Sequence, residues 1–194
     1  GSADLATVRV RAEAGGFDLL PANRDMAGAE VELVEEKQRE FRLKHALGDL
    51  GGHYDYVLID CPPALNLLTV NALTCADAVI IPMQCEYFAI EGLADLVNTI
   101  KKIKARLNPA LVIDGVVRVM FDNRNTLAQH VSDQLKGHFG AKVFDTLVPR
   151  NVRLAEAPSH GLAALQYDRS SRGAQAYLQM ARELIEKQEG KRHG

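Results

Sequence analysis

The alternation of short apolar runs with longer stretches of helical period is what most restricts how this chain can fold. Continuous apolar runs predict strands over residues 17–23, 54–60, 77–83, 112–121 and 142–149. Apolar positions three and four residues apart predict helices over residues 29–50, 66–76, 93–107, 125–139 and 174–187. Strands that alternate with helices predict an α/β fold, in which helices cover both faces of a mainly parallel sheet.

Length and composition narrow the class of protein. With 194 residues, 47% of them hydrophobic, we expect a single domain over residues 3–187 and a disordered tail over 188–194. A net charge of −2 excludes a polycation that coats nucleic acid, so any contact with DNA must come from a local patch. Because no apolar run is long enough to cross a membrane, we expect a cytoplasmic protein without a membrane partner.

Polar side chains follow the predicted strands at their carboxyl ends, where open parallel sheets bind their ligands. They include Asp60 after the second strand, Arg124 after the fourth, and Arg150, Asn151 and Arg153 after the fifth. We therefore expect the functional site along this edge of the sheet.

The stretch YDYVLIDCPP, residues 54–63, is an apolar strand that ends on a carboxylate. This is the general form of a Walker B element, whose aspartate orients Mg²⁺ beside a nucleotide phosphate. A strand-terminal aspartate also commonly caps the next helix, and both interpretations of Asp60 stay open on this stretch alone. Pro62 and Pro63 fix the backbone after it and favour a stiff loop.

Five blocks in a fixed order carry a resemblance to a known family. They are YDYVLIDCPPALNLLTVNAL, AVIIPMQCEYFAIEGLADLVNTI, VMFDNRNTLAQHV, VPRNVRLAEAPSHG and YDRSSRGAQAYL. Together they resemble the ParA/Soj family of partition ATPases, deviant Walker proteins related to MinD, over roughly residues 8–187. The resemblance implies a P-loop NTPase-like fold.

One motif of that family is missing from the sequence. Family members carry a glycine-rich loop of the type KGGxGKT, and no GxxxxGK[ST] occurs in these 194 residues. The resemblance therefore implies that this chain matches the C-terminal two-thirds of the family's ATPase domain, without the P-loop. We expect this fragment to be inactive as an ATP hydrolase and to bind neither ATP nor Mg²⁺, both of which the intact protein would use.

The resemblance also assigns roles to individual residues. Asp60 corresponds to the Walker B aspartate, a catalytic residue that holds Mg²⁺ through water in the intact protein. Pro149, Arg150 and Asn151 would contact the nucleotide base, and Met120 and Phe121 would form the apolar wall of its site. The alternative is an ordinary turn, in which proline and asparagine act as turn formers.

Arg124 and Arg153 match positions where family members use surface arginines for non-specific DNA binding. Such contacts neutralise phosphates and do not depend on base sequence. The alternative is a pair of solvated arginines.

The function implied by the resemblance is chromosome or plasmid partition. A nucleoid-associated ATPase would dimerise on ATP, bind non-specific DNA, and be stimulated by a centromere-binding, ParB-like partner. One alternative is a non-catalytic ParA-like module that binds DNA or protein. Another is a MinD-like positioning ATPase, which the polar C-terminus ELIEKQEGKRHG does not favour, because that group ends in a basic amphipathic helix.

Overall fold

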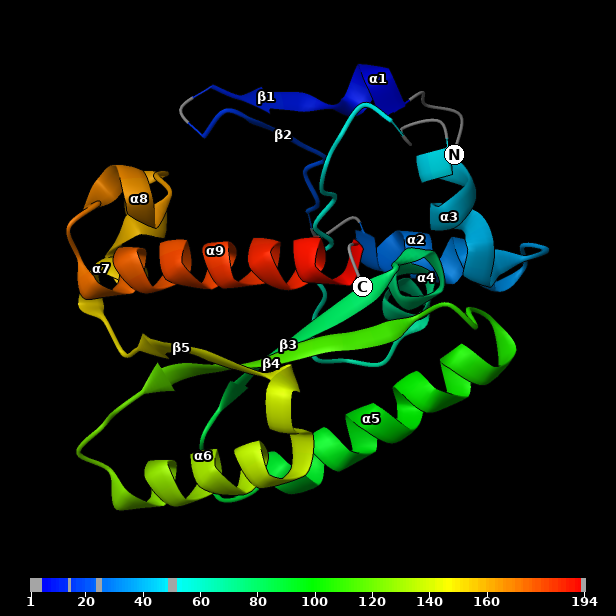
Figure 1. Cartoon of the computed structure of the whole chain (residues 1–194). Helices are drawn as coiled ribbons and strands as arrows, with labels where there is room; N and C mark the ends of the chain where they lie inside the picture. Colours follow the sequence, from blue (N-terminus) through cyan, green and yellow to red (C-terminus); the bar gives the residue numbers. More distant parts are fainter. Residues whose placement is uncertain (1–4, 14, 24–25, 49–51, 193–194) are drawn as a thin grey trace. The chain divides into compact units, whose positions relative to one another are not determined.

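A computed structural model describes residues 5–13, 15–23, 26–48 and 52–192. The chain divides into two compact units, which are described in turn (Figure 1). The first comprises Gly1–Ala78 and Asn98–Val112, and the second comprises Val79–Val97 and Ile113–Gly194. The prediction of one domain over residues 3–187 stays a prediction.

The first unit begins with a short helix and a hairpin. Helix α1 (Leu5–Val8) precedes strand β1 (Val10–Ala12), which pairs antiparallel with β2 (Phe17–Leu19). The hairpin turn uses Gly16 in the left-handed region, at φ 69°. The strand predicted over residues 17–23 is thus present only in its first three residues.

Two helices with a 3₁₀ turn between them replace the single helix predicted over residues 29–50. They are α2 (Met26–Val34), η1 (Arg39–Phe41) and α3 (Arg42–Leu47). The interruption falls at Gln38, whose φ is 53°. The buried side chain of Asn71 fixes the restart, because it accepts a hydrogen bond from the Leu43 N–H (3.1 Å) and donates one to the Arg39 carbonyl (2.8 Å). Residues 49 and 50 lie outside the described part of the chain.

The strand predicted over residues 54–60 is wrong for this structure. Residues 56–62 form no regular secondary structure, and Val57 and Leu58 are 54% and 84% exposed. A strand exists only where a neighbouring strand accepts and donates its backbone hydrogen bonds, and none of the described strands pairs with this segment. Apolar sequence alone therefore did not produce a strand here.

Helix α4 (Leu67–Cys75) confirms the helix predicted over residues 66–76. Asn66 begins it, with a side-chain oxygen that accepts from the Thr69 N–H at 3.0 Å. Asn108 closes its other end, because its buried amide donates to the carbonyls of Leu73 (3.0 Å) and Ala76 (2.7 Å). Both helix ends are thus satisfied by asparagine side chains.

The second unit is built on a three-stranded sheet of order β3-β4-β5. The strands are β3 (Ala78–Gln84), β4 (Val112–Phe121) and β5 (Val143–Pro149), and β4 pairs parallel with β5. The helices that connect and flank them are α5 (Ala89–Arg106), of which Asn98–Arg106 belong to the first unit, α6 (Thr126–Phe139) and α9 (Arg172–Arg192). In Figure 1, α9 lies on one face of this sheet and α6 on the other, which confirms the predicted α/β class.

The two faces of β4 pack differently. Val117 joins Phe144 and Val148 of β5 in an apolar core against Ala176 of α9. On the opposite side, the 2% exposed Arg118 donates to Ser132 Oγ of α6 (2.7 Å) and to the Phe144 carbonyl (2.6 Å). The sheet therefore has an apolar layer beneath α9 and a buried arginine beneath α6.

Short helices fill the region between β5 and α9, for which the sequence predicts only a loop. They are α7 (Val152–Glu156), η4 (Ala157–His160) and α8 (Ala164–Tyr167). A further 3₁₀ turn, η3 (Gly140–Lys142), precedes β5. Helix α9 extends to Arg192, five residues beyond the predicted domain end, and residues 193–194 lie outside the described part, so the disordered tail stays a prediction.

Candidate functional site

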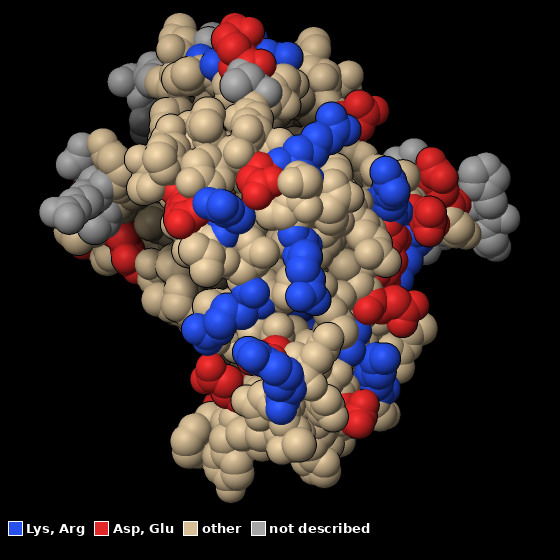
Figure 2. Space-filling view, turned by 90° about the vertical axis from the view of Figure 1, so that its left-hand side faces the viewer, with Lys and Arg blue, Asp and Glu red and all other residues tan. Residues whose placement is uncertain are grey.

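The carboxyl ends of β4 and β5 open into a hollow of about 810 Å³ in the second unit. Figure 2 views this side of the molecule and shows several Lys and Arg side chains gathered on it. Arg124, Arg150 and Arg172 line the hollow, and Phe121 and Pro149 contribute apolar wall. The volume suits a small organic ligand, and the lining suits one that combines an apolar part with negative charge.

The end of β4 supplies one wall. Phe121 is 8% exposed, and its carbonyl accepts a hydrogen bond from the Arg150 N–H at 3.2 Å, which ties the two strand ends together. Met120 adopts φ 50°, at a place where the pairing of β4 with β5 shifts register. Met120 is 44% exposed and does not line the hollow, so the two residues predicted to form one wall are not together there.

The loop after β4 carries a tight ion pair. The Asp122 carboxylate accepts from Nη2 of Arg124 (2.9 Å), from its Nε (3.1 Å) and from its backbone N–H (3.0 Å). These hydrogen bonds, first the side-chain ones, lower the pKa of Asp122 to about 2, with a smaller contribution from the charge of Arg150. The Arg124 side chain is still 90% exposed, so its outer face remains accessible to an anion.

The end of β5 leads into α7 through Asn151. The Asn151 side chain accepts from the Arg153 N–H (3.0 Å) and so begins the helix. Pro149 and Arg150 line the hollow, whereas Asn151 does not. Asn151 therefore has a local structural role in this arrangement.

Arg153, the second arginine predicted to contact DNA, also lies outside the hollow lining. Its Nη1 is 2.9 Å from Glu156 Oε2, and its Nε is 3.5 Å from Asp168 Oδ2. The hydrogen bond with Glu156 is the largest of the interactions that raise the pKa of Arg153. Two carboxylates thus compete for this guanidinium with any outside anion.

The first turns of α9 add residues that sequence reasoning did not single out. Arg172, Gln175 and Gln179 line the hollow, and they recur at helical spacing on one side of α9. That spacing was a visible signal, but the predicted helix began at residue 174 and so left Arg172 in a loop. Gly173 lets α7 approach closely, because a Cβ there would lie 2.5 Å from Leu154 Cγ.

Asp60 belongs to the first unit, in the irregular segment described above. Its side chain is exposed, and its charge helps raise the pKa of the neighbouring Cys61 thiol, after the larger effect of burial. No group of three or more His, Cys, Asp or Glu suited to a metal occurs among the described residues. A lone aspartate fits Mg²⁺ that is held mainly by water and nucleotide oxygens, not a cage of protein ligands.

Comparison with known proteins gives consistent matches. A family model described as an AAA domain matches residues 2–113, more than half of the chain. The chromosome partitioning protein ParA of Caulobacter vibrioides is 50% identical over 190 residues, which are 97% of this chain and 71% of that protein. The sporulation initiation inhibitor protein Soj of Bacillus subtilis is 48% identical over 182 residues, 94% of this chain and 72% of that protein.

Solved structures share the fold. The structure of cobyrinic acid a,c-diamide synthase from Mycobacterium smegmatis superposes with a TM-score of 0.78 at 36% identity, over 94% of this chain and 67% of that one. The same protein was also solved with a bound ATP analog and magnesium (TM-score 0.70, 38% identity, 76% of this chain and 60% of that one). The cell division ATPase MinD of Pyrococcus furiosus superposes with a TM-score of 0.71 at 20% identity, over 97% of this chain and 71% of that one. This similarity shows a shared fold only.

A parallel sheet between helices, with these neighbours, defines a protein of the P-loop NTPase-like α/β class. Within that class, the chain belongs to the ParA/Soj family of partition ATPases. In the part of the chain that the structure describes, no helix is long and apolar enough to cross a membrane.

Proposed function

We propose that this chain carries the base-contacting part of a partition ATPase, and that the hollow at the ends of β4 and β5 binds the nucleotide weakly without the phosphate-binding loop, although the resemblance implies that the fragment binds no ATP. The meeting of Phe121, Pro149 and Arg150 in one hollow is the observation that carries this proposal. These residues belong to two strands that are far apart in sequence.

The chemistry of the hollow supports a nucleotide. Phe121 and Pro149 offer apolar surface to a purine ring, while Arg150 and Arg172 oppose the negative charge of its phosphates. The structure of the M. smegmatis relative with an ATP analog and magnesium supports the same ligand class. Asp60, in the first unit, would hold Mg²⁺ through water in the intact protein.

The sequence lacks a GxxxxGK[ST] motif, whose backbone N–H groups and lysine bind phosphates in other NTPases. We therefore propose that the 194-residue chain neither hydrolyses ATP nor forms the ATP-dependent dimer. Hydrolysis, dimerisation and stimulation by a ParB-like, centromere-binding partner would belong to a protein that also carries that loop. Measurable ATP turnover by the purified chain would contradict this assignment.

Non-specific DNA binding is the second part of the proposal. The exposed face of Arg124 and the guanidinium of Arg153 would each neutralise a phosphate. Such a protein would act on the nucleoid, in the cytoplasm. A non-catalytic module that binds DNA through the same arginines is the second candidate, favoured by the 90% exposure of the Arg124 side chain.

Equilibrium binding tests the nucleotide site. Fluorescence anisotropy of a labelled adenine nucleotide would be followed with the unmodified chain, Arg150→Ala and Arg172→Ala. Arg182→Ala is the matched control, since Arg182 is an exposed arginine of α9 outside the hollow. We expect both hollow variants to weaken binding and the control to leave it unchanged, whereas equal affinity in all four proteins would contradict the proposal.

A further inference from the structure

Strand β4 carries one residue more than β5 at the end that forms the hollow. Arg118 of β4 pairs with Leu147 of β5. The next pair, Phe121 with Pro149, comes three residues later on β4 but only two residues later on β5. An unshifted register would set Met120, not Phe121, opposite Pro149. The extra residue is a β-bulge, a feature that bends a strand locally and recurs beside functional sites.

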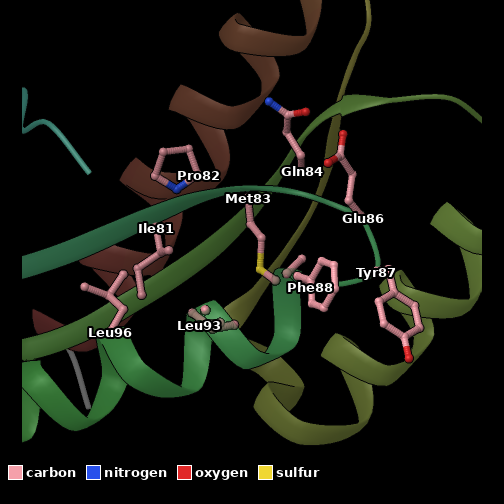
Figure 3. A pocket seen from close by; sticks show the side chains of 11 residues that line it. Ile81, Pro82, Met83, Gln84, Glu86, Tyr87, Phe88, Leu93 and Leu96 are labelled. Carbon is pink, nitrogen blue, oxygen red and sulfur yellow. The ribbon is translucent and has the colours of Figure 1, made fainter. Parts of the chain in front are cut away.

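Met120 takes up this extra residue in a backbone conformation that methionine rarely adopts. Its φ is 50°, in the left-handed region, where the Cβ crowds the backbone. Among the described residues of the strands, Met120 alone has a positive φ. Strand β3, in contrast, alternates regularly to its end: Figure 3 shows Ile81 and Met83 directed toward α5, while Pro82 and Gln84 point away. The irregularity therefore belongs to the end of β4.

Packing of the Met120 side chain does not account for this backbone. The residue is 44% exposed and does not line the hollow. Its neighbour Phe121 is 8% exposed and lines the hollow, and the Phe121 carbonyl accepts from the Arg150 N–H at 3.2 Å. A strained residue beside a ligand hollow, with little packing of its own, indicates a role in holding its neighbours.

We propose that Met120 is a positioning residue for the nucleotide base, an inference that rests on the proposed nucleotide site. Its left-handed backbone accommodates the bulge, which sets Phe121 opposite Pro149 and brings the Arg150 N–H to the Phe121 carbonyl. Met120 acts through these neighbours, since it is not part of the lining. A residue that resists this conformation would shift the strand end and take Phe121 out of the apolar wall.

Three substitutions at this one position separate the backbone from the side chain. Met120→Val introduces a branched Cβ, which strongly disfavours a positive φ and should displace the bulge. Met120→Leu changes the side chain but not the backbone preference, and is the matched control. Met120→Asn introduces a residue that tolerates the left-handed region, so the bulge should persist.

Calorimetric titration of the full 194-residue chain with ATP and with tripolyphosphate separates base contacts from phosphate contacts. We expect Met120→Val to weaken ATP by about tenfold, as the loss of an aromatic contact would, and to leave the affinity for tripolyphosphate unchanged. Met120→Leu and Met120→Asn should bind both ligands as the unmodified chain does. A merely structural role of Met120 would weaken both ligands together in Met120→Val.

Hydrogen exchange of the Arg150 amide tests the geometry without a ligand. The bond to the Phe121 carbonyl should protect this amide in the unmodified chain and in Met120→Leu, and Met120→Val should speed its exchange. Equal exchange in Met120→Val and Met120→Leu, or an equal preference of both for ATP over tripolyphosphate, would overturn the inference. An unmodified chain that binds no ATP would contradict the nucleotide proposal, and the Arg150 amide would still decide whether Met120 holds the strand ends.

Discussion

Arg118 and Phe144 join the two parallel strands at their core: Nη2 of Arg118 donates to the carbonyl oxygen of Phe144 at 2.6 Å. The guanidinium is 2% exposed and also donates to Ser132, while its Nε has no partner among the described residues. The strands fixed in this way are the two whose ends form the proposed nucleotide hollow. The buried charge therefore lies in the element that positions the site.

Arg118→Ala should destabilise the chain. The change removes a buried side chain and leaves the Ser132 hydroxyl without that partner, so we expect a loss of about 3 kcal/mol in the free energy of unfolding. Arg118→Met keeps most of the volume without a buried charge, and should cost less than the alanine variant. Urea unfolding followed by circular dichroism measures both, and an unchanged midpoint for Arg118→Ala would contradict the structure.

Replacing Gly115 or Gly137 with alanine should change the free energy of unfolding in opposite directions. A Cβ on Gly115 of β4 would lie 2.6 Å from Cδ2 of Phe144 and 3.0 Å from the Lys142 carbonyl, so overpacking should cost about 1–3 kcal/mol. A Cβ on Gly137, inside α6, meets no atom within 4 Å, and alanine should stabilise that helix by about 0.5–1 kcal/mol. Thermal unfolding checks the pair, and equal shifts of Tm would be inconsistent with the packing of Phe144.

The sequence was sufficient to predict most of the second unit. Strand β4 has the predicted bounds, 112–121, and α6 begins one residue after its predicted start because Asn125 caps it. Both elements have a strong apolar pattern, and α6 also has a local cap. The local sequence therefore favours the same structure that the packing requires. The fold class followed from them.

Pairing and tertiary contacts decided the rest. Residues 54–60 have the composition of a strand, but none of the described strands pairs with them. The composition of a segment does not reveal whether a neighbouring strand is there to pair with it. The break before α3 depends on Asn71, 28 residues from the Leu43 N–H that it caps. In the candidate site, the predicted residues Phe121, Pro149 and Arg150 line one hollow. The sequence analysis did not identify Arg172, because it placed the start of the last helix at residue 174.

The pKa of Asp122 should lie well below that of an ordinary aspartate. Its pKa of about 2 lies below the value of 3.8 for a free side chain, so the pairing with Arg124 stabilises the folded state above pH of roughly 4. That contribution is lost as the pH falls from about 4 through about 2, because the unfolded carboxyl takes up its proton first. Carboxyl ¹³C shifts measured against pH report the value directly.

Arg124→Gln is the variant for that titration. It removes the two side-chain hydrogen bonds to the carboxylate and keeps the backbone one, so the pKa of Asp122 should rise part of the way toward 3.8. Arg182→Gln, which removes an exposed arginine from α9, should leave the titration of Asp122 in place. A pKa of Asp122 that stays near 2 in Arg124→Gln would show that the ion pair is not its cause.

The carboxylates around Arg153 should restrain DNA binding, if that arginine contacts phosphate as proposed. The double variant Glu156→Gln with Asp168→Asn frees the guanidinium and should tighten binding to non-specific duplex DNA by about threefold at low salt, the scale of exposed ion pairs. Asp133→Asn with Glu186→Gln changes the net charge equally and is the control. Equal effects of the two double variants would attribute the gain to net charge, not to Arg153.

The most direct test of the nucleotide site is a map of where an adenine nucleotide touches the chain. Amide ¹H–¹⁵N spectra of the full 194-residue chain would be recorded during titration with ATP, with tripolyphosphate as the control that lacks a base. The account predicts that ATP shifts the amides of Phe121, Arg150 and Arg172, and that tripolyphosphate moves Phe121 far less. ATP shifts confined to residues outside the hollow, or identical maps for the two ligands, would contradict it.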